Sequence, residues 1–186
     1  MQTNKDPFDW WKRNANLEFE SGDVRIYNIE GEDYLFIGQT IYASTKELPW
    51  YIHNLYSKIR GQVLEIGLGL GCASRLICSC SRIKHLLTIE KNEDVILAFG
   101  RPLSHHHIIH ADINEWSKNL APVDMFDLIF VDHYTMGDED IYPELEELSM
   151  RLRPLVKKNG NLVFWIDENA PDEDQEFIRK LWYTRD

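Results

Sequence analysis

The chain has 186 residues, of which 44% are hydrophobic and 27% are charged, and its formal net charge is −11. This length is enough for a full three-layer core, as in a single globular protein. The acidic balance argues against binding nucleic acid through a broad basic face, and it suits a small cationic substrate. No apolar stretch approaches the roughly 20 residues that cross a bilayer. The amino-terminal residues also lack a signal-peptide pattern, so we expect a cytoplasmic protein without a membrane partner.

The amino-terminal part predicts a small region of its own over residues 1–46. Residues 1–22 are polar and aromatic without periodicity, and we expect a short helix or an arm there. From Val24 apolar and polar residues alternate, and breaks at residues 30–33 and 38–39 predict two or three short antiparallel strands. Pro49 then opens a predicted helix.

The rest of the chain, residues 47–186, predicts a cofactor-binding domain in which strands and helices alternate. The expected strands are 62–66, 85–90, 107–111, 126–131 and 161–166, and the expected helices are 71–80, 92–99, 114–119, 141–153 and 173–182. Apolar strands separated by helices predict a parallel sheet covered by helices on both faces, which is a Rossmann-like α/β fold.

The segment GQVLEIGLGLGCASRLICSCSRIKHLLTIE, residues 61–90, carries the strongest signal. Gly67, Gly69 and Gly71 allow a sharp turn from strand to helix and a close approach of the backbone to a ligand. The helix that follows directs free amides at that ligand. An adenosine-containing cofactor fits this pattern, whereas the dinucleotide fingerprint would place its third glycine at Cys72.

Three acids follow at strand ends. Glu65, at the tip of the first parallel strand, is placed to meet a cationic ammonium group. Glu90 follows Gly67 by 23 positions, where an acid can bind both ribose hydroxyls, and Asp112 ends a third strand near the expected adenine. The alternative is that the glycines only form a tight turn and the acids cap helices. Four such features in chain order favour a cofactor site.

These residues resemble the class I S-adenosylmethionine-dependent methyltransferases, through VLEIGLGLG, TIEKNEDVI and FDLIFVDHY. The closer resemblance is to the spermidine synthase (polyamine aminopropyltransferase) branch of that fold, from about Val24 to Ile166. It implies that S-adenosylmethionine or its decarboxylated form is the cofactor. It also implies roles for particular residues: Glu90 at the ribose, Asp112 and Ile113 at the adenine, and Asp132 in deprotonating an amine. Lys91, next to Glu90, is also expected to bind the cofactor.

The chain departs from that branch at several positions. Leu70 replaces an acid that holds the aminopropyl end of the decarboxylated cofactor, and Glu65 stands where an apolar residue is usual. Both changes favour intact S-adenosylmethionine. Thr135 replaces the second acid of the fourth-strand pattern, and Asp186 follows the fifth strand too soon for the usual closing hairpin. These two changes argue against polyamine activity.

The acceptor side depends on Asp132, which can orient an amine and take its proton, with Tyr134 shaping the pocket. A weaker resemblance, to guanidinoacetate methyltransferase through residues 47–51 and 132–134, also puts an acid at Asp132. The main hypothesis is therefore a methyltransferase that acts on a small, amine-containing acceptor. The alternatives are a spermidine synthase-like aminopropyltransferase and a degenerate cofactor-binding or assembly protein.

Two further expectations concern metals and partners. Adjacent residues on a strand point to opposite faces, so His105, His106 and His107 do not predict a metal site. The strand over 161–166 would leave an unpaired apolar edge, because the expected closing hairpin is missing. Such edges are commonly covered by pairing, and we therefore predict an oligomer, most simply a homodimer.

Overall fold

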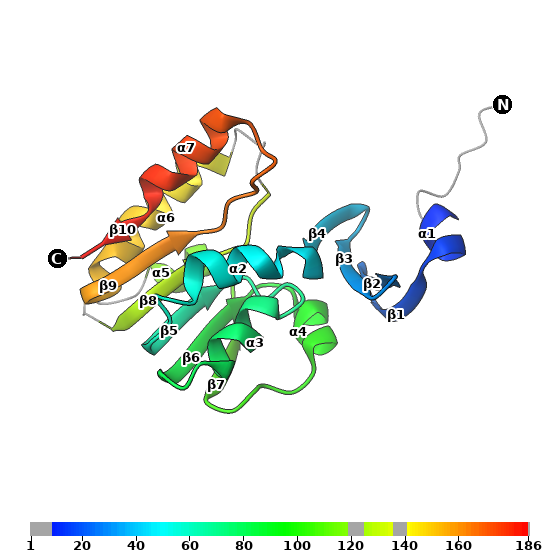
Figure 1. Cartoon of the computed structure of the whole chain (residues 1–186), viewed down its shortest axis with the longest axis horizontal. Coiled ribbons are helices and arrows are strands. Elements are labelled where there is room, and N and C mark those ends of the chain that lie inside the picture. Colours follow the sequence, from blue (N-terminus) through cyan, green and yellow to red (C-terminus); the bar gives the residue numbers. More distant parts are fainter. Residues whose placement is uncertain (1–8, 119–124, 136–140, 186) are drawn as a thin grey trace.

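A computed structural model describes residues 9–118, 125–135 and 141–185 of the chain. In this part of the chain the strands form two sheets, an antiparallel sheet of four strands and a mixed sheet of six. Figure 1 shows the smaller sheet beside the larger one, which is packed between helices. The predicted fold class, α/β with a separate amino-terminal antiparallel part, is confirmed.

The amino-terminal sheet is a meander in the order β1-β2-β3-β4. Its strands are β1 (Asn16–Ser21), β2 (Val24–Ile29), β3 (Glu32–Ile37) and β4 (Thr40–Ser44), and helix α1 (Asp9–Asn14) precedes them. The sequence analysis expected at most three strands and missed β1, which pairs with β2. Most of β1 is exposed, and its apolar alternation consists of Leu17 and Phe19 alone, which is too short to indicate a strand.

The large sheet has the order β10-β9-β8-β5-β6-β7. Its strands are β5 (Gly61–Ile66), β6 (Ile83–Glu90), β7 (His106–His110), β8 (Phe126–Val131), β9 (Val156–Phe164) and β10 (Tyr183–Thr184). Every pairing in it is parallel except that of β10 with β9. The five predicted parallel strands are all present.

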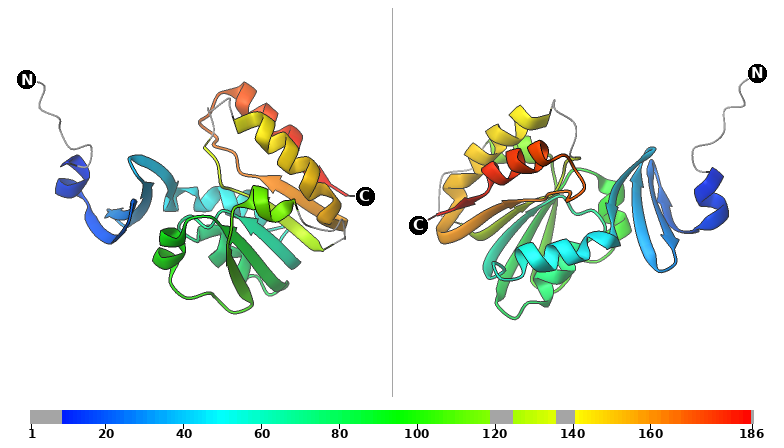
Figure 2. Two further views of the ribbon diagram at one scale, coloured as in Figure 1. Left: turned by 180° about the vertical axis from the view of Figure 1, so that it is seen from behind. Right: turned by 45° about the horizontal axis from the view of Figure 1, so that its top comes forward.

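Helices cover both faces of this sheet, as predicted. They are α2 (Leu48–Leu55), α3 (Cys72–Ser79), α4 (Glu93–Phe99), α5 (Ile113–Ser117), α6 (Tyr142–Leu152) and α7 (Asp172–Leu181), with 3₁₀ turns at Thr45–Glu47 and Arg153–Leu155. Helices α2, α3 and α4 lie on one face, and α5, α6 and α7 lie on the other (Figures 1 and 2). None of the helices in the described residues is long and apolar enough to cross a bilayer.

The order of the strands places a crevice at one edge of the sheet. The chain builds outward from β5 through β6 to β7, and then returns to add β8 on the other side of β5. Connections on either side of β5 therefore run in opposite directions above the carboxyl ends of β5 and β8. A ligand site is expected at such a reversal. Ile66 at the end of β5 pairs with Ile89 on one side and with Val131 on the other.

The edge of the sheet differs from its prediction. Strand β9 begins at Val156 rather than at residue 161, and Leu162 pairs with Tyr183 of β10. The indole Nε1–H of Trp182 donates to the carbonyl oxygen of Phe164 at 2.9 Å. The side chains of Leu162 and Phe164 are fully buried. The expectation of an unpaired apolar edge was wrong, because residues near the end of the chain fold back onto it. The homodimer stays a prediction without this premise.

The two sheets share a small apolar cluster. Leu35 and Ala43 of the amino-terminal sheet are buried together with Leu68 of the glycine turn and Val95 of α4. This contact fixes the amino-terminal sheet beside the crevice. The division at residue 46 stays a prediction.

Candidate functional site

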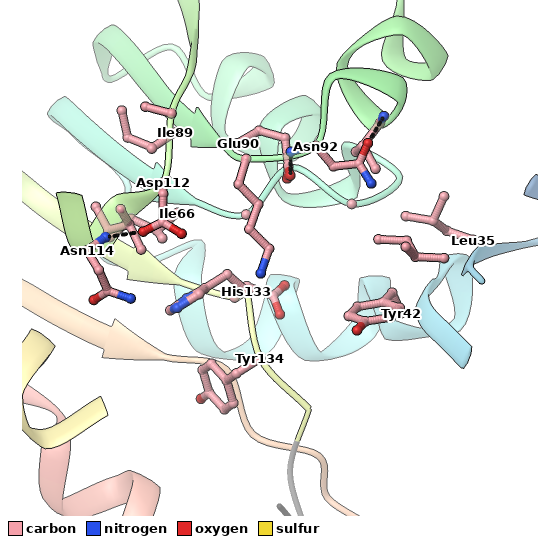
Figure 3. Close-up of a pocket in the computed structure, with 18 of the residues that line it drawn as sticks. Leu35, Tyr42, Ile66, Ile89, Glu90, Asn92, Asp112, Asn114, His133 and Tyr134 are labelled. Atoms are coloured by element: carbon pink, nitrogen blue, oxygen red, sulfur yellow. Dashed lines mark hydrogen bonds between the residues drawn. The ribbon is translucent and has the colours of Figure 1, made fainter. Parts of the chain in front are cut away.

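The main cavity, of about 290 Å³, lies at the carboxyl ends of β5, β6, β7 and β8 (Figure 3). Most of the predicted site residues line it: Gly67, Gly69, Glu90, Lys91, Asp112, Ile113, Asp132 and Tyr134. In Figure 3 Asp112 and Asn114 lie at one end, Leu35 and Tyr42 at the other, and Glu90 between them. The fold therefore brings together residues from widely separated segments, as the strand-end pattern predicts.

The glycine turn has two separable roles. Gly67 has a φ of 91°, and a Cβ there would lie 2.0 Å from the backbone carbonyl oxygen of Asp132. This glycine thus lets the ends of β5 and β8 come together beneath the cavity. Gly71 has a φ of 70°, precedes α3, and would place a Cβ against the Phe99 ring. Gly71 lines neither cavity described here, so its role is in the turn rather than at the ligand.

Glu90 ties the glycine turn to the end of β6. Its Oε2 accepts a hydrogen bond from the Leu68 amide at 2.9 Å, and its Oε1 accepts one from the Asn92 amide at 2.7 Å. Asn92 in turn caps α4. Both carboxylate oxygens are therefore held in place at the cavity wall, and the residue keeps 8% of its surface exposed.

Asp112 is the residue before α5 and caps that helix. Its Oδ1 accepts a hydrogen bond from the Asn114 amide at 2.7 Å, which leaves its second oxygen for a ligand. The Asn114 side chain donates to Glu144 and accepts from Arg151 at 2.6 Å. This end of the cavity is thus rigidly held by hydrogen bonds between α5 and α6.

The amino-terminal sheet supplies one wall of the cavity, through Leu35, Ile37 and Tyr42. The sequence analysis did not identify these residues. Alternation in residues 24–44 indicates strands, but it contains nothing that says which face meets a ligand. Tyr42 keeps 47% of its surface exposed, which marks it as a residue that a ligand could contact. This exposure is visible only in the structure.

A second, much smaller cavity of about 20 Å³ adjoins the first and shares Tyr42, Gly67, Gly69 and Asp132 with it. That volume holds about one water molecule, or one ammonium group of similar size. Three carboxyl groups line it, those of Glu47, Glu65 and Asp132. Within the described residues its lining contains no lysine or arginine. We call it the acidic pocket.

Tyr51 of α2 joins two of these carboxyl groups. Its hydroxyl lies 2.7 Å from Oε2 of Glu47 and 2.9 Å from Oδ2 of Asp132. A hydroxyl has one proton to donate, so both contacts are hydrogen bonds only if one carboxyl group is itself protonated. Burial, followed by the repulsion of Glu47, raises the pKa of Asp132 well above its usual value. Burial also raises the pKa of Glu47. Both shifts favour a protonated carboxyl group in this cluster, as the two contacts of Tyr51 require.

Glu65 lies deeper than the sequence analysis expected. It is fully buried, and its Oε2 accepts hydrogen bonds from the hydroxyls of Ser74 and, at 2.6 Å, Thr88. Glu65 lines the acidic pocket, and its Oε1 is buried without a hydrogen-bond partner among the described residues. Burial raises the pKa of Glu65 to about 7. A buried carboxylate oxygen without a donor is costly, and a cationic ligand would supply one.

Tyr134 and His133 follow Asp132 at the floor of the main cavity. The Tyr134 hydroxyl donates to the carbonyl oxygen of Trp165, so this residue shapes the cavity rather than moving protons. Burial, together with the nearby Lys91, lowers the pKa of His133 to about 4. His133 is therefore neutral at physiological pH.

Glu47 and Tyr51 line the acidic pocket, and neither was given a role from the sequence. Both belong to the segment that resembles guanidinoacetate methyltransferase, so that weak likeness was their signal. Glu47 also accepts a hydrogen bond from the Ser44 amide, which completes a capping box and fixes the start of this segment.

Comparison with protein-family models and with curated proteins yields no match. Solved structures do match. The spermidine synthase from Thermotoga maritima superposes with a TM-score of 0.66 at 16% identity, over 89% of this chain and 61% of that one. A spermidine synthase in complex with the transition-state analogue AdoDATO gives a TM-score of 0.65 at 16% identity, over 89% and 60%. The chain thus spans about 60% of the length of these proteins. At such identity the likeness establishes a spermidine synthase-like fold and nothing finer.

Proposed function

We propose that the protein is a transferase that binds decarboxylated S-adenosylmethionine and passes its aminopropyl group to a small amine. The observation that carries this proposal is the acidic pocket, where three carboxyl groups surround a space the size of one ammonium group. The likeness to spermidine synthases supports the same choice of donor and reaction, because one of them was solved with the transition-state analogue AdoDATO. The sequence favoured intact S-adenosylmethionine as the donor, whereas this proposal takes the decarboxylated form.

The main cavity suits the adenosyl part of such a ligand. Glu90 would accept hydrogen bonds from the ribose hydroxyls, and the free oxygen of Asp112 would accept one from the adenine amino group. Leu35 and Ile37 would cover the nucleoside from the amino-terminal sheet. The volume of about 290 Å³ is near the lower end of the range for small-molecule sites.

The acidic pocket distinguishes the two forms of the donor. Intact S-adenosylmethionine carries a carboxylate beside its ammonium group, and here that carboxylate would face Glu47, Glu65 and Asp132. Like charges in a desolvated site oppose binding. The decarboxylated donor presents the ammonium alone, which would pair with the free oxygen of Glu65. Glu65 would thus do from β5 what the missing acid at Leu70 does in the enzymes that this chain resembles.

The reaction is an in-line displacement at the carbon next to the sulfonium. The nitrogen lone pair of the acceptor forms a C–N bond while the C–S bond breaks, and its electrons return to sulfur as a neutral thioether. The nitrogen must be unprotonated to attack, and its surplus proton would pass to the Asp132 carboxylate. Tyr51 would hold that carboxylate in position. The sulfonium charge disperses along the reaction coordinate, so a dry cavity favours the transition state.

Methyl transfer from intact S-adenosylmethionine is the second candidate. Leu70 favours it, because an apolar residue lines the acidic pocket at the position of the missing acid. Glu65 also favours it, because methyltransferases commonly carry an acid at this point. A third candidate, a cofactor-binding protein without turnover, predicts ligand binding and no product.

Titration calorimetry with both forms of the donor tests the proposal. The wild-type protein should bind the decarboxylated form at least tenfold more tightly, and Glu65→Gln should reduce that preference. Glu90→Gln should weaken both forms equally, because it touches only the adenosyl part. Exposed Glu93, on α4, offers a matched control in Glu93→Gln.

Turnover is then followed by mass spectrometry with a diamine acceptor. Aminopropylated amine and methylthioadenosine should appear together in equal amounts. Preference for the intact donor, with methylated amine as product, would replace the proposal with the second candidate. Binding without either product would support the third.

A further inference from the structure

A chain of buried polar side chains leads from the acidic pocket across the large sheet. Glu65 of β5 pairs with Thr88 of β6, and His106 of β7 lies diagonally beside Thr88, so all three residues share one face of the sheet. Thr88 is fully buried and His106 is 4% exposed. The Thr88 hydroxyl lies 2.6 Å from Oε2 of Glu65 and 2.8 Å from Nε2 of His106. The polar chain is therefore continuous and dry.

The number of protons in this chain permits two arrangements. When Glu65 is ionised, Thr88 donates to it, and Nε2 of His106 must carry the proton that Thr88 accepts. When Glu65 is protonated on Oε2, it donates to Thr88, and Thr88 donates to an unprotonated Nε2. His106 then carries its proton on Nδ1. Each arrangement satisfies every contact between these three side chains, and they differ in the histidine tautomer.

We propose that Glu65, Thr88 and His106 form a proton relay in which His106 exchanges tautomers whenever Glu65 gains or loses a proton. Ionisation moves the Glu65 proton to Thr88 and the Thr88 proton to Nε2 of His106, and His106 gives up its Nδ1 proton. Nδ1 is buried and has no hydrogen-bond partner among the described residues, so this proton reaches solvent when the protein opens locally around His106. One proton leaves, and no bond to carbon changes. This inference rests on the proposed function in one respect: an ammonium group bound at Glu65 would expel its proton through His106, away from the filled cavity.

The surroundings keep the two ends of the relay distinct. Burial and the repulsion of Glu90 raise the pKa of Glu65 to about 7. Burial lowers the pKa of His106 to about 4, and His107 and His85 add to this effect. Near neutral pH, Glu65 therefore changes charge while His106 stays neutral, so in the relay His106 responds through its tautomer rather than through its charge.

Other titratable or charged groups face the relay from each neighbouring element. Those coupled to Glu65 are Cys78 of α3, Glu90 of β6 and Asp132 after β8, and those beside His106 are His85 of β6, His107 of β7 and, across the Phe99 ring, Arg75 of α3. Among the described residues none of these groups is hydrogen-bonded to the Thr88 hydroxyl, which links Glu65 to His106. Thr88 is thus the position at which the relay can be cut.

Nuclear magnetic resonance of the ¹⁵N-histidine-labelled full chain tests the relay without any ligand. Between about pH 5.5 and 8.5, His106 should pass from the Nδ1–H to the Nε2–H tautomer, with its midpoint at the ionisation of Glu65. Thr88→Val should abolish that change while the Glu65 carboxyl still titrates, and Thr88→Ser should retain it. One fixed tautomer of His106 in the wild type, a protonated imidazolium, or an unchanged response in Thr88→Val would overturn the relay.

A second measurement separates the relay from the proposed function. Decarboxylated S-adenosylmethionine, added at about pH 6, should move His106 to the Nε2–H tautomer by ionising Glu65. A pH-driven change without this ligand response would uphold the relay and overturn the placement of the ammonium group. Ligand binding without any tautomer change would uphold the proposed function and overturn the relay.

Discussion

The buried Glu65 makes a quantitative prediction about stability. Folding raises its pKa from the ordinary value of 4.5 to about 7, so between these two values the folded protein holds a proton that the unfolded chain releases. The free energy of unfolding must therefore fall as the pH rises from about 4.5 to about 7. One pKa unit corresponds to about 1.4 kcal/mol, so this residue lowers the stability by roughly 3 kcal/mol at alkaline pH. Glu65→Gln removes that dependence, because an amide does not ionise.

Urea unfolding followed by tryptophan fluorescence measures the effect. Between about pH 5 and pH 8, the wild type should lose roughly 2–3 kcal/mol more of its unfolding free energy than Glu65→Gln loses. Comparison of the two variants cancels the contributions of the titrating groups that are not coupled to Glu65. Glu168→Gln, at an exposed position, should follow the wild type. If wild type and Glu65→Gln change in parallel over this range, Glu65 is ionised at neutral pH and the argument fails.

Three further variants test other features. Gly67→Ala should lose about 2–4 kcal/mol of stability in urea unfolding, because its Cβ would meet the Asp132 backbone. Gly100→Ala is the control: it also has a positive φ but open space around it, and it should lose about 1 kcal/mol. Equal losses would contradict the close approach of Gly67 to the Asp132 backbone. Trp182→Phe should lower the unfolding free energy by about 1 kcal/mol through the hydrogen bond to Phe164, and sedimentation should show an unchanged oligomeric state. Tyr51→Phe should reduce the rate of group transfer roughly tenfold while calorimetric affinity for the donor stays within about twofold; unchanged turnover would remove Tyr51 from the site.

The alternation of apolar strands and helices sufficed to predict the large sheet, since five buried strands with a glycine turn after the first admit few topologies. The same pattern placed Glu90 and Asp112 correctly at strand ends, because parallel strands all end at one edge of their sheet. Glycine spacing predicted the turn, yet it did not reveal that Gly67, which lines the cavity, also lies against the Asp132 backbone. The spacing of glycines indicates where the chain turns, but it does not indicate which atoms lie against the turn.

The acidic pocket was beyond prediction for a different reason. Glu47 and Asp132 are far apart in sequence, and their meeting depends on how α2 lies across the ends of β5 and β8. Glu65 was expected at the tip of its strand. It lies one residue before the end of β5 and is buried under α3, where the Ser74 hydroxyl donates a hydrogen bond to it. The closing strand β10 is only two residues long, which is too short for any alternation to show.

The wall that Leu35, Ile37 and Tyr42 contribute links ligand occupancy to the docking of the whole amino-terminal sheet. A ligand that touches this wall binds only molecules in which the sheet is docked, so it must lower the frequency at which the sheet opens. Amide hydrogens of β2 should then exchange more slowly in the presence of ligand, although no residue of β2 lines the cavity. The amino-terminal meander would in this way report, through its own local stability, whether the cavity beside it is filled.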